Sequence, residues 1–166
     1  TVVGISPFSD TPPYASQLNE LTVGSEGWGV EWVSWHENQF IVAECQYNLG
    51  LESEALLTLN NTLDNLEQRW QEYDSSCQLP RYIDITGPDL LASIMNEKYK
   101  AMFLNMQTLS DWRRTGYPIF KDRDGVSTEC DGGTPRRLLY PELEKKTNSN
   151  VPAGDSIFDR VENDPS

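Results

Sequence analysis

The sequence predicts an all-α protein, made of helical hairpins of a repeat-like type with long irregular loops. Apolar residues recur at intervals of three and four over residues 52–73. A second set of apolar residues, between positions 91 and 109, would line one side of a helix. Residue types that start and stop helices flank these stretches. This patterning leaves little room for sheet, so we expect three long helices.

The first helix is predicted to begin near Ser34, after a loop-rich segment of Gly, Pro, Ser and Thr. Ser34 is followed three positions later by Glu37, which is a capping box that satisfies backbone N–H groups at a helix start. Gly50 marks the end of the helix. We expect its apolar side to consist of Phe40, Ile41, Ala43, Cys45, Tyr47 and Leu49, with Cys45 as a buried thiol.

The second helix is predicted over about residues 52–73. Its apolar residues are spaced by three, four, three and four, which places them on one stripe of a helix: Leu56, Leu59, Leu63, Leu66 and Trp70. Because the link to the first helix is short and contains Gly50, the two helices should pack as an antiparallel hairpin.

The third helix is predicted to begin at Thr86 or Gly87, with Pro88 in its first turn, where no backbone N–H is needed. We expect it to continue to about Arg113 and to end at Gly116 and Pro118. Its apolar residues, expected to be buried, include Met102, Phe103 and Met106. Beyond it we expect loop, a short extended stretch over residues 136–141 and a polar tail.

These elements divide the chain into a loop-rich lead-in (1–33), a helical domain (34–150) and a surface tail (151–166). The first residue is Thr1, the start has no features of a signal peptide, and no run of eighteen apolar residues occurs. We therefore expect a fragment of a larger protein. Residues 1–68 contain ten acidic residues and neither Lys nor Arg. This charge argues against nucleic acid or an anionic membrane surface as a partner, and fits a neutral ligand, a basic partner surface or simple solubility.

Three segments, in order, resemble the C-terminal part of the SusD/RagB family of nutrient-binding outer-membrane lipoproteins. The first, Glu37 to Gly50, is similar to that family's E-x-x-F-I-x-A-E helix followed by L-G. The second is IMNEKYKAMFLNMQTLSDWRRTGYP, Ile94 to Pro118, and the third is TPRRLLYPELEKKTNSN, Thr134 to Asn150. The second and third segments, at this spacing in the chain, are specific to the family, whereas the first segment alone is a weak match.

The resemblance implies an all-helical fold of tetratricopeptide-type hairpins. It also implies non-catalytic binding of glycans or other large nutrients at the bacterial cell surface, and their delivery to a SusC-like TonB-dependent transporter. Such proteins lie on the extracellular face of the outer membrane through a lipid anchor, which we expect in the full-length parent and not in this fragment. The implied ligand is a polysaccharide or oligosaccharide, and no cofactor or metal is implied. The alternative is a helical-hairpin scaffold that binds another protein and no sugar.

The candidate ligand-binding residues are Trp28, Trp32 and Trp35, whose spacing of four and three puts them on one side of a helical turn. Aromatic faces stack on the C–H surface of sugar rings, and the indole N–H can donate to a hydroxyl. The competing interpretation is that the three rings pack against the first helix.

A second group forms the family signature: Glu97, Asp111, Trp112, Arg113, Arg114, Arg136 and Arg137. Arginine forks and a stacking indole can bind a ligand. We favour a structural interpretation, in which arginine–carboxylate pairs fix a helix end. Glu97, Asp111, Glu142 and Glu144 are the expected partners of Arg136 and Arg137.

The sequence offers little for catalysis or metal binding. Glu37 and Glu44 lie seven positions apart and resemble a glycosidase acid pair only in spacing, while His36 is the sole histidine. The oxygen-rich loop Asp122–Asp131 does not match an EF-hand, because its Gly stands at the fourth position. Cys45, Cys77 and Cys130 fit no zinc pattern, and a Cys77–Cys130 disulfide is left open.

Overall fold

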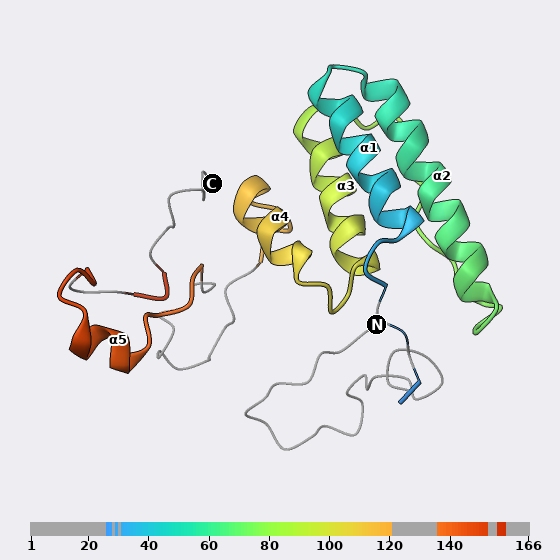
Figure 1. Cartoon of the computed structure of the whole chain (residues 1–166). Coiled ribbons are helices and arrows are strands. Elements are labelled where there is room, and N and C mark those ends of the chain that lie inside the picture. The colour runs from blue at the N-terminus through green and yellow to red at the C-terminus, as the bar shows by residue number, and fades with distance from the viewer. Residues whose placement is uncertain (1–25, 28, 30, 121–135, 153–155, 159–166) are drawn as a thin grey trace, which may run out of the picture.

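The computed structural model describes residues 26–27, 29, 31–120, 136–152 and 156–158. These residues form five helices and no strand: α1 (Trp35–Asn48), α2 (Glu52–Gln71), α3 (Gly87–Ala101), α4 (Gln107–Thr115) and α5 (Glu142–Thr147). Figure 1 shows α1, α2 and α3 packed side by side, with α4 beside the lower end of α3 and α5 apart from them. The prediction of an all-α fold is confirmed.

The first two helices form the predicted antiparallel hairpin (Figure 1). Ser34 caps α1, since its Oγ accepts a hydrogen bond of 2.9 Å from the backbone N–H of Glu37. Gly50 has a φ of +77°, a left-handed conformation that glycine adopts without strain, so the chain can reverse there. The hairpin is observed as predicted, and its tetratricopeptide type stays a prediction.

Helix α3 packs mainly on α1 and runs in the same direction as α2. The long link before it is held to α2 by Asn60, whose side chain donates to the backbone oxygen of Tyr82 (2.9 Å) and accepts from its nitrogen (3.0 Å). The apolar core shared by the three helices consists of Phe40, Ala43, Ala55, Leu59, Leu63, Leu66, Leu90, Ile94 and Met95. This core fixes the three helices as one packed body.

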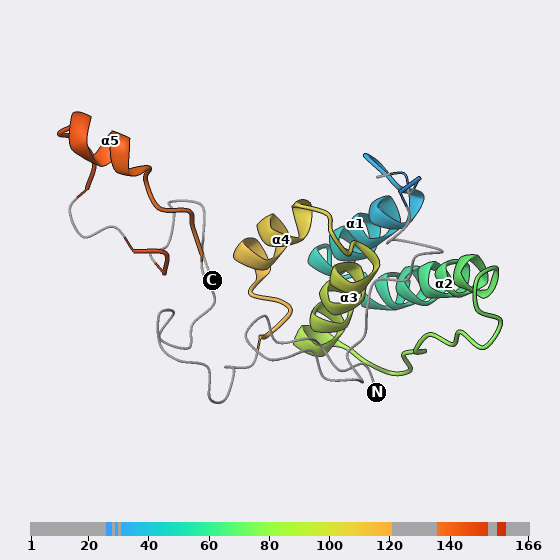
Figure 2. The same ribbon diagram turned by 90° about the horizontal axis from the view of Figure 1, so that it is seen from below.

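The third helix does not run unbroken to Arg113 as predicted. It ends at Ala101, and a turn over residues 102–106 separates it from α4. Leu104 adopts a φ of +68°, which no α-helix contains. The side chain of Asn105 then accepts a hydrogen bond of 2.8 Å from the backbone N–H of Gln107, which begins α4. The break rotates α4 away from the axis of α3, as Figure 2 shows from below.

Several apolar residues expected to be buried are exposed. Of the three on the third helix, Met102 is buried, whereas Phe103 and Met106 lie in the solvent-exposed turn, where the helical periodicity no longer applies. Cys45, Ile41 and Leu49 on α1 are also exposed, against the prediction of a buried thiol. Positions 41, 45 and 49 are four apart and lie on the same side of the helix, which is exposed, whereas Ala43 lies on the buried side.

Helix α4 ends as predicted, at Gly116 with a φ of +76°, whose N–H donates to the oxygen of Trp112. The segment at 136–141 is irregular rather than paired as a strand, and the N–H groups of Arg136 and Arg137 both donate to the oxygen of Ile157. Most of the predicted lead-in and tail lies outside the described residues, so the division into 1–33, 34–150 and 151–166 stays a prediction.

Candidate functional site

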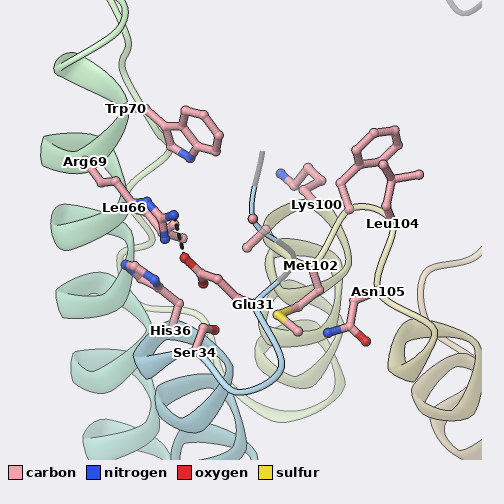
Figure 3. Close-up of a pocket in the computed structure, with 13 residues that line it drawn as sticks. Glu31, Ser34, His36, Leu66, Arg69, Trp70, Lys100, Met102, Leu104 and Asn105 are labelled. Carbon is pink, nitrogen blue, oxygen red and sulfur yellow. Dashed lines mark hydrogen bonds and ion pairs between the residues drawn. The ribbon is translucent and has the colours of Figure 1, made fainter. Parts of the chain in front are cut away.

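A pocket of about 270 Å³ lies where the start of α1, the end of α2 and the α3–α4 turn meet. Figure 3 shows the indole of Trp70 on the α2 side, opposite Lys100 and Leu104 on the α3 side. Met102 and Leu66 supply apolar surface within it. The pocket is thus built from segments far apart in the sequence.

Two charged side chains on one wall of the pocket are paired with each other. Arg69, in the last turn of α2, donates from Nη2 to Oε1 of Glu31 at 2.6 Å. Lys100, on the opposite side, is bound to the buried carboxylate of Glu97, which is not itself part of the lining. The pocket therefore presents paired rather than isolated charges.

Asn105 presents an amide to the same pocket. Its oxygen is engaged by the N–H of Gln107, and Figure 3 shows its nitrogen on the side of the pocket. Amide nitrogens carry two donor hydrogens, so this side chain can donate to a ligand oxygen while its own oxygen holds the helix start.

His36 lies in the first turn of α1 and is mostly buried. Its Nε2 donates to Oδ1 of Asn65 at 2.9 Å, so the ring is tied to α2. Burial lowers the pKa of His36 below its ordinary value of 6.5, and the nearby guanidinium of Arg69 lowers it further, although the hydrogen bond to Asn65 opposes both effects. His36 is therefore a neutral, positioned side chain at pH 7.

The structure describes two of the three predicted ligand-binding tryptophans. Trp32 is 93% exposed and Trp35 is 51% exposed, so neither ring is buried against the helices. Trp35 contacts the ring of His36 edge to face, with 5.3 Å between centroids. Trp28 lies outside the described residues, and Trp32 and Trp35 stand at the start of α1, next to the pocket segment rather than in its lining.

The signature residues meet in a different place, where α4 touches α1 and α3. Asp111 is buried; its Oδ2 forms an ion pair with Nζ of Lys98 at 2.6 Å, and its Oδ1 accepts a hydrogen bond from Nη2 of Arg114 at 2.9 Å. Arg114 also forms two hydrogen bonds with Glu44 of α1. Lys98 is itself buried, whereas Arg114 is half exposed, so the chain Lys98–Asp111–Arg114–Glu44 joins three helices through one buried and two partly exposed ion pairs.

The remaining signature residues support the same helix end. Trp112 is buried, and the guanidinium of Arg136 lies 4.7 Å from the centroid of its ring. Arg137 lies in the same way over Tyr140, at 5.0 Å. Both arginines thus make aromatic contacts that the sequence did not lead us to expect. Arg113, on α4, is half-buried.

Glu97 is buried on α3 and holds the link between α2 and α3. It accepts hydrogen bonds from the hydroxyl of Tyr82 and from Nζ of Lys100. Burial and this carboxylate together raise the pKa of Tyr82 well above its ordinary value, so the phenol stays protonated and continues to donate.

The features considered for catalysis and metal binding gain no support. Glu44 is bound to Arg114, so it is not available to act as an acid paired with Glu37. Within the described residues no group of three or more His, Cys, Asp or Glu side chains is placed to hold a metal ion. The loop Asp122–Asp131 and Cys130 lie outside the described residues, and Cys45 and Cys77 are free thiols.

Fold and site together define a helical protein with exposed aromatic rings and a small pocket lined by both apolar and polar side chains. A family model described as "Starch-binding associating with outer membrane" matches residues 26–141. The chain belongs to this SusD-like family, as the sequence resemblance predicted. Neither a comparison with curated proteins nor one with solved structures gives a match. In the part of the chain that the structure describes, no helix is long and apolar enough to cross a membrane.

Proposed function

We propose that this chain captures glycans at the extracellular face of the outer membrane, without catalysis, and passes them to a TonB-dependent transporter. Membership of a starch-binding, outer-membrane-associated family supports the ligand class and the location. The proposed contact surface is the start of α1, where Trp32 and Trp35 present their rings to solvent.

The observation that carries this proposal is the exposure of these two rings. Exposed tryptophans are unfavourable in water unless another surface covers them, and their flat apolar faces match the C–H faces of sugar rings. Exposed indole rings of this kind suit a neutral, hydroxyl-rich ligand that offers C–H faces.

The test is native affinity electrophoresis of the chain in gels that contain starch or another polysaccharide. We expect the wild-type chain to be retarded and the double variant Trp32→Ala/Trp35→Ala to migrate freely. The matched control is Leu49→Ala/Ile83→Ala, which removes exposed apolar side chains elsewhere and should leave retardation unchanged.

A scaffold that binds another protein is the second candidate. Phe103, Leu104 and Met106 in the α3–α4 turn are exposed apolar side chains, and contiguous apolar surface commonly marks protein contacts. A chain that no polysaccharide retards would support this alternative and contradict glycan capture.

A further inference from the structure

We propose that the pocket between Trp70, the Glu31–Arg69 pair and Asn105 binds a single neutral hexopyranose ring, at the end or on a branch of a glycan. The proposal rests on the proposed glycan-binding function and adds a site distinct from Trp32 and Trp35. It names the chemical class of the ligand that the pocket would accept.

The size of the pocket argues for one ring. Its volume of about 270 Å³ falls just below the range of roughly 300–1,000 Å³ that is typical of pockets for drug-sized ligands. A chain of several sugars would therefore extend out of the pocket. Only one ring would be surrounded by the lining residues.

The lining has the two kinds of surface that a sugar ring needs. Trp70 supplies an aromatic face, and Leu66 and Met102 add apolar contact near it. Glu31 and Arg69 stand side by side, so neighbouring hydroxyls of a ring can donate to the carboxylate and accept from the guanidinium. The amide nitrogen of Asn105 adds a donor from the opposite wall.

The charge arrangement selects a neutral sugar. Among the described lining residues, Arg69 is paired with Glu31 and Lys100 with Glu97, so each cation is balanced by a carboxylate. An acidic sugar would place its carboxylate close to Glu31 and be repelled. A neutral sugar ring replaces its hydrogen bonds to water by hydrogen bonds to Glu31, Arg69 and Asn105 and is not repelled by Glu31.

The backbone conformation of Leu104 is a separate observation that favours a ligand site at the α3–α4 turn. It lines the pocket and adopts a left-handed conformation that is unfavourable for a leucine, and its side chain is largely exposed. Burial of this side chain does not compensate for the strain. Strained backbone positions of this type cluster at ligand sites.

The experiment is titration of the whole chain with methyl α-D-glucopyranoside, followed through the indole ¹H–¹⁵N resonance of Trp70. Loss of that resonance in Trp70→Phe assigns it. We expect a saturable shift, and in Arg69→Met a dissociation constant that is about tenfold higher, because a charge-assisted hydrogen bond is lost.

Arg81→Met is the matched control. Arg81 is as exposed as Arg69 (36% and 35%) and also pairs with carboxylates, but it lies outside the pocket, so its replacement should leave the dissociation constant unchanged. Glu31→Gln gives a second test that leaves the helices intact, since Glu31 precedes α1 and is half exposed. We expect several-fold weaker binding from it.

Three results would overturn the proposal: no shift of Trp70, equal effects of Arg69→Met and Arg81→Met, or a shift at lower concentration with glucuronate than with the neutral glycoside. The double variant Trp32→Ala/Trp35→Ala separates the two sites. If it abolishes retardation by polysaccharide while the glycoside never moves Trp70, the pocket proposal fails and glycan capture stands. If the glycoside shifts Trp70 but no polysaccharide retards the chain, glycan capture fails and the pocket stands.

Discussion

Arg114 binds the carboxylate of Glu44 through two hydrogen bonds, although the two residues lie seventy positions apart. The pair joins the end of α4 to the middle of α1, and Asp111 and Lys98 extend it to α3. Glu44 and Asp111 are buried while Arg114 is half exposed, so the helix end that carries the family signature is held by an arginine paired with two buried carboxylates. This geometry favours an architectural role for the signature, and the proposed ligand contacts lie elsewhere, at the start of α1 and in the pocket.

Replacement of Arg114 by Met should destabilise the fold by about 2 kcal/mol. Breaking a buried ion pair costs about 3–5 kcal/mol, but Arg114 is half exposed, so solvent screening reduces the loss. Urea unfolding monitored by circular dichroism measures the change. Lys145→Met, which removes a looser pair on α5 at 3.5 Å, should change stability by less than about 0.5 kcal/mol. Equal losses in the two variants would contradict the network.

Lys98 and Asp111 should be strongly coupled in a double-mutant cycle. Each single change, Lys98→Met or Asp111→Asn, leaves the other residue's buried charge without its partner. We expect each to lower the free energy of unfolding by about 3 kcal/mol. In the double variant that penalty is largely relieved, so the two losses should fall short of additivity by at least about 1 kcal/mol. Thermal or urea unfolding of the four proteins gives the coupling energy. Additive losses would show that the pair does not interact.

His36 should make the fold less stable as the pH falls below about 6.5. Its pKa is lowered in the folded chain, so the unfolded chain takes up the proton first, and protonation therefore favours unfolding. The contribution of His36 is complete above its unfolded pKa of about 6.5 and is lost as the pH falls toward its folded pKa. Urea midpoints between pH 7.5 and 5.5 measure this. His36→Asn should flatten the dependence, and an unchanged slope would refute the assignment.

Leu104→Gly should raise stability by about 0.5–1 kcal/mol. The left-handed conformation costs a leucine roughly 1–2 kcal/mol, and glycine avoids this cost while losing more entropy on folding. Asp84 also has a positive φ, of 53°, but aspartate tolerates this conformation better, so Asp84→Gly should change stability little. The comparison is made by unfolding in urea. A destabilised Leu104→Gly would mean that the leucine side chain contributes more than its backbone costs.

The elements that the sequence predicted correctly are those encoded by local chemistry. The start of α1 follows from the hydroxyl of Ser34, and the stripe of α2 follows from the spacing of Leu59, Leu63 and Leu66. The end of α4 follows from Gly116, which takes the left-handed conformation that ends many helices. Each of these signals lies within a few residues of the feature that it determines.

What the sequence did not predict depends on tertiary contacts or on subtle local signals. The break before α4 was missed because apolar residues continue through it without Gly or Pro, and the only local polar signal is Asn105, whose side chain accepts from the N–H of Gln107. The pocket was missed because Glu31, Arg69 and Asn105 approach one another only in the folded chain. A basic residue at the end of one helix gives no sign of its partner thirty-eight positions earlier.

Isothermal titration of the chain with soluble starch and a panel of other polysaccharides tests glycan capture most directly. The account predicts saturable binding to at least one polysaccharide, and at least about tenfold weaker binding by Trp32→Ala/Trp35→Ala, since each stacked ring contributes about 0.5–1.5 kcal/mol beyond its buried area. Absence of binding to every polysaccharide, or equal affinity of the wild-type chain and the double variant, would contradict it.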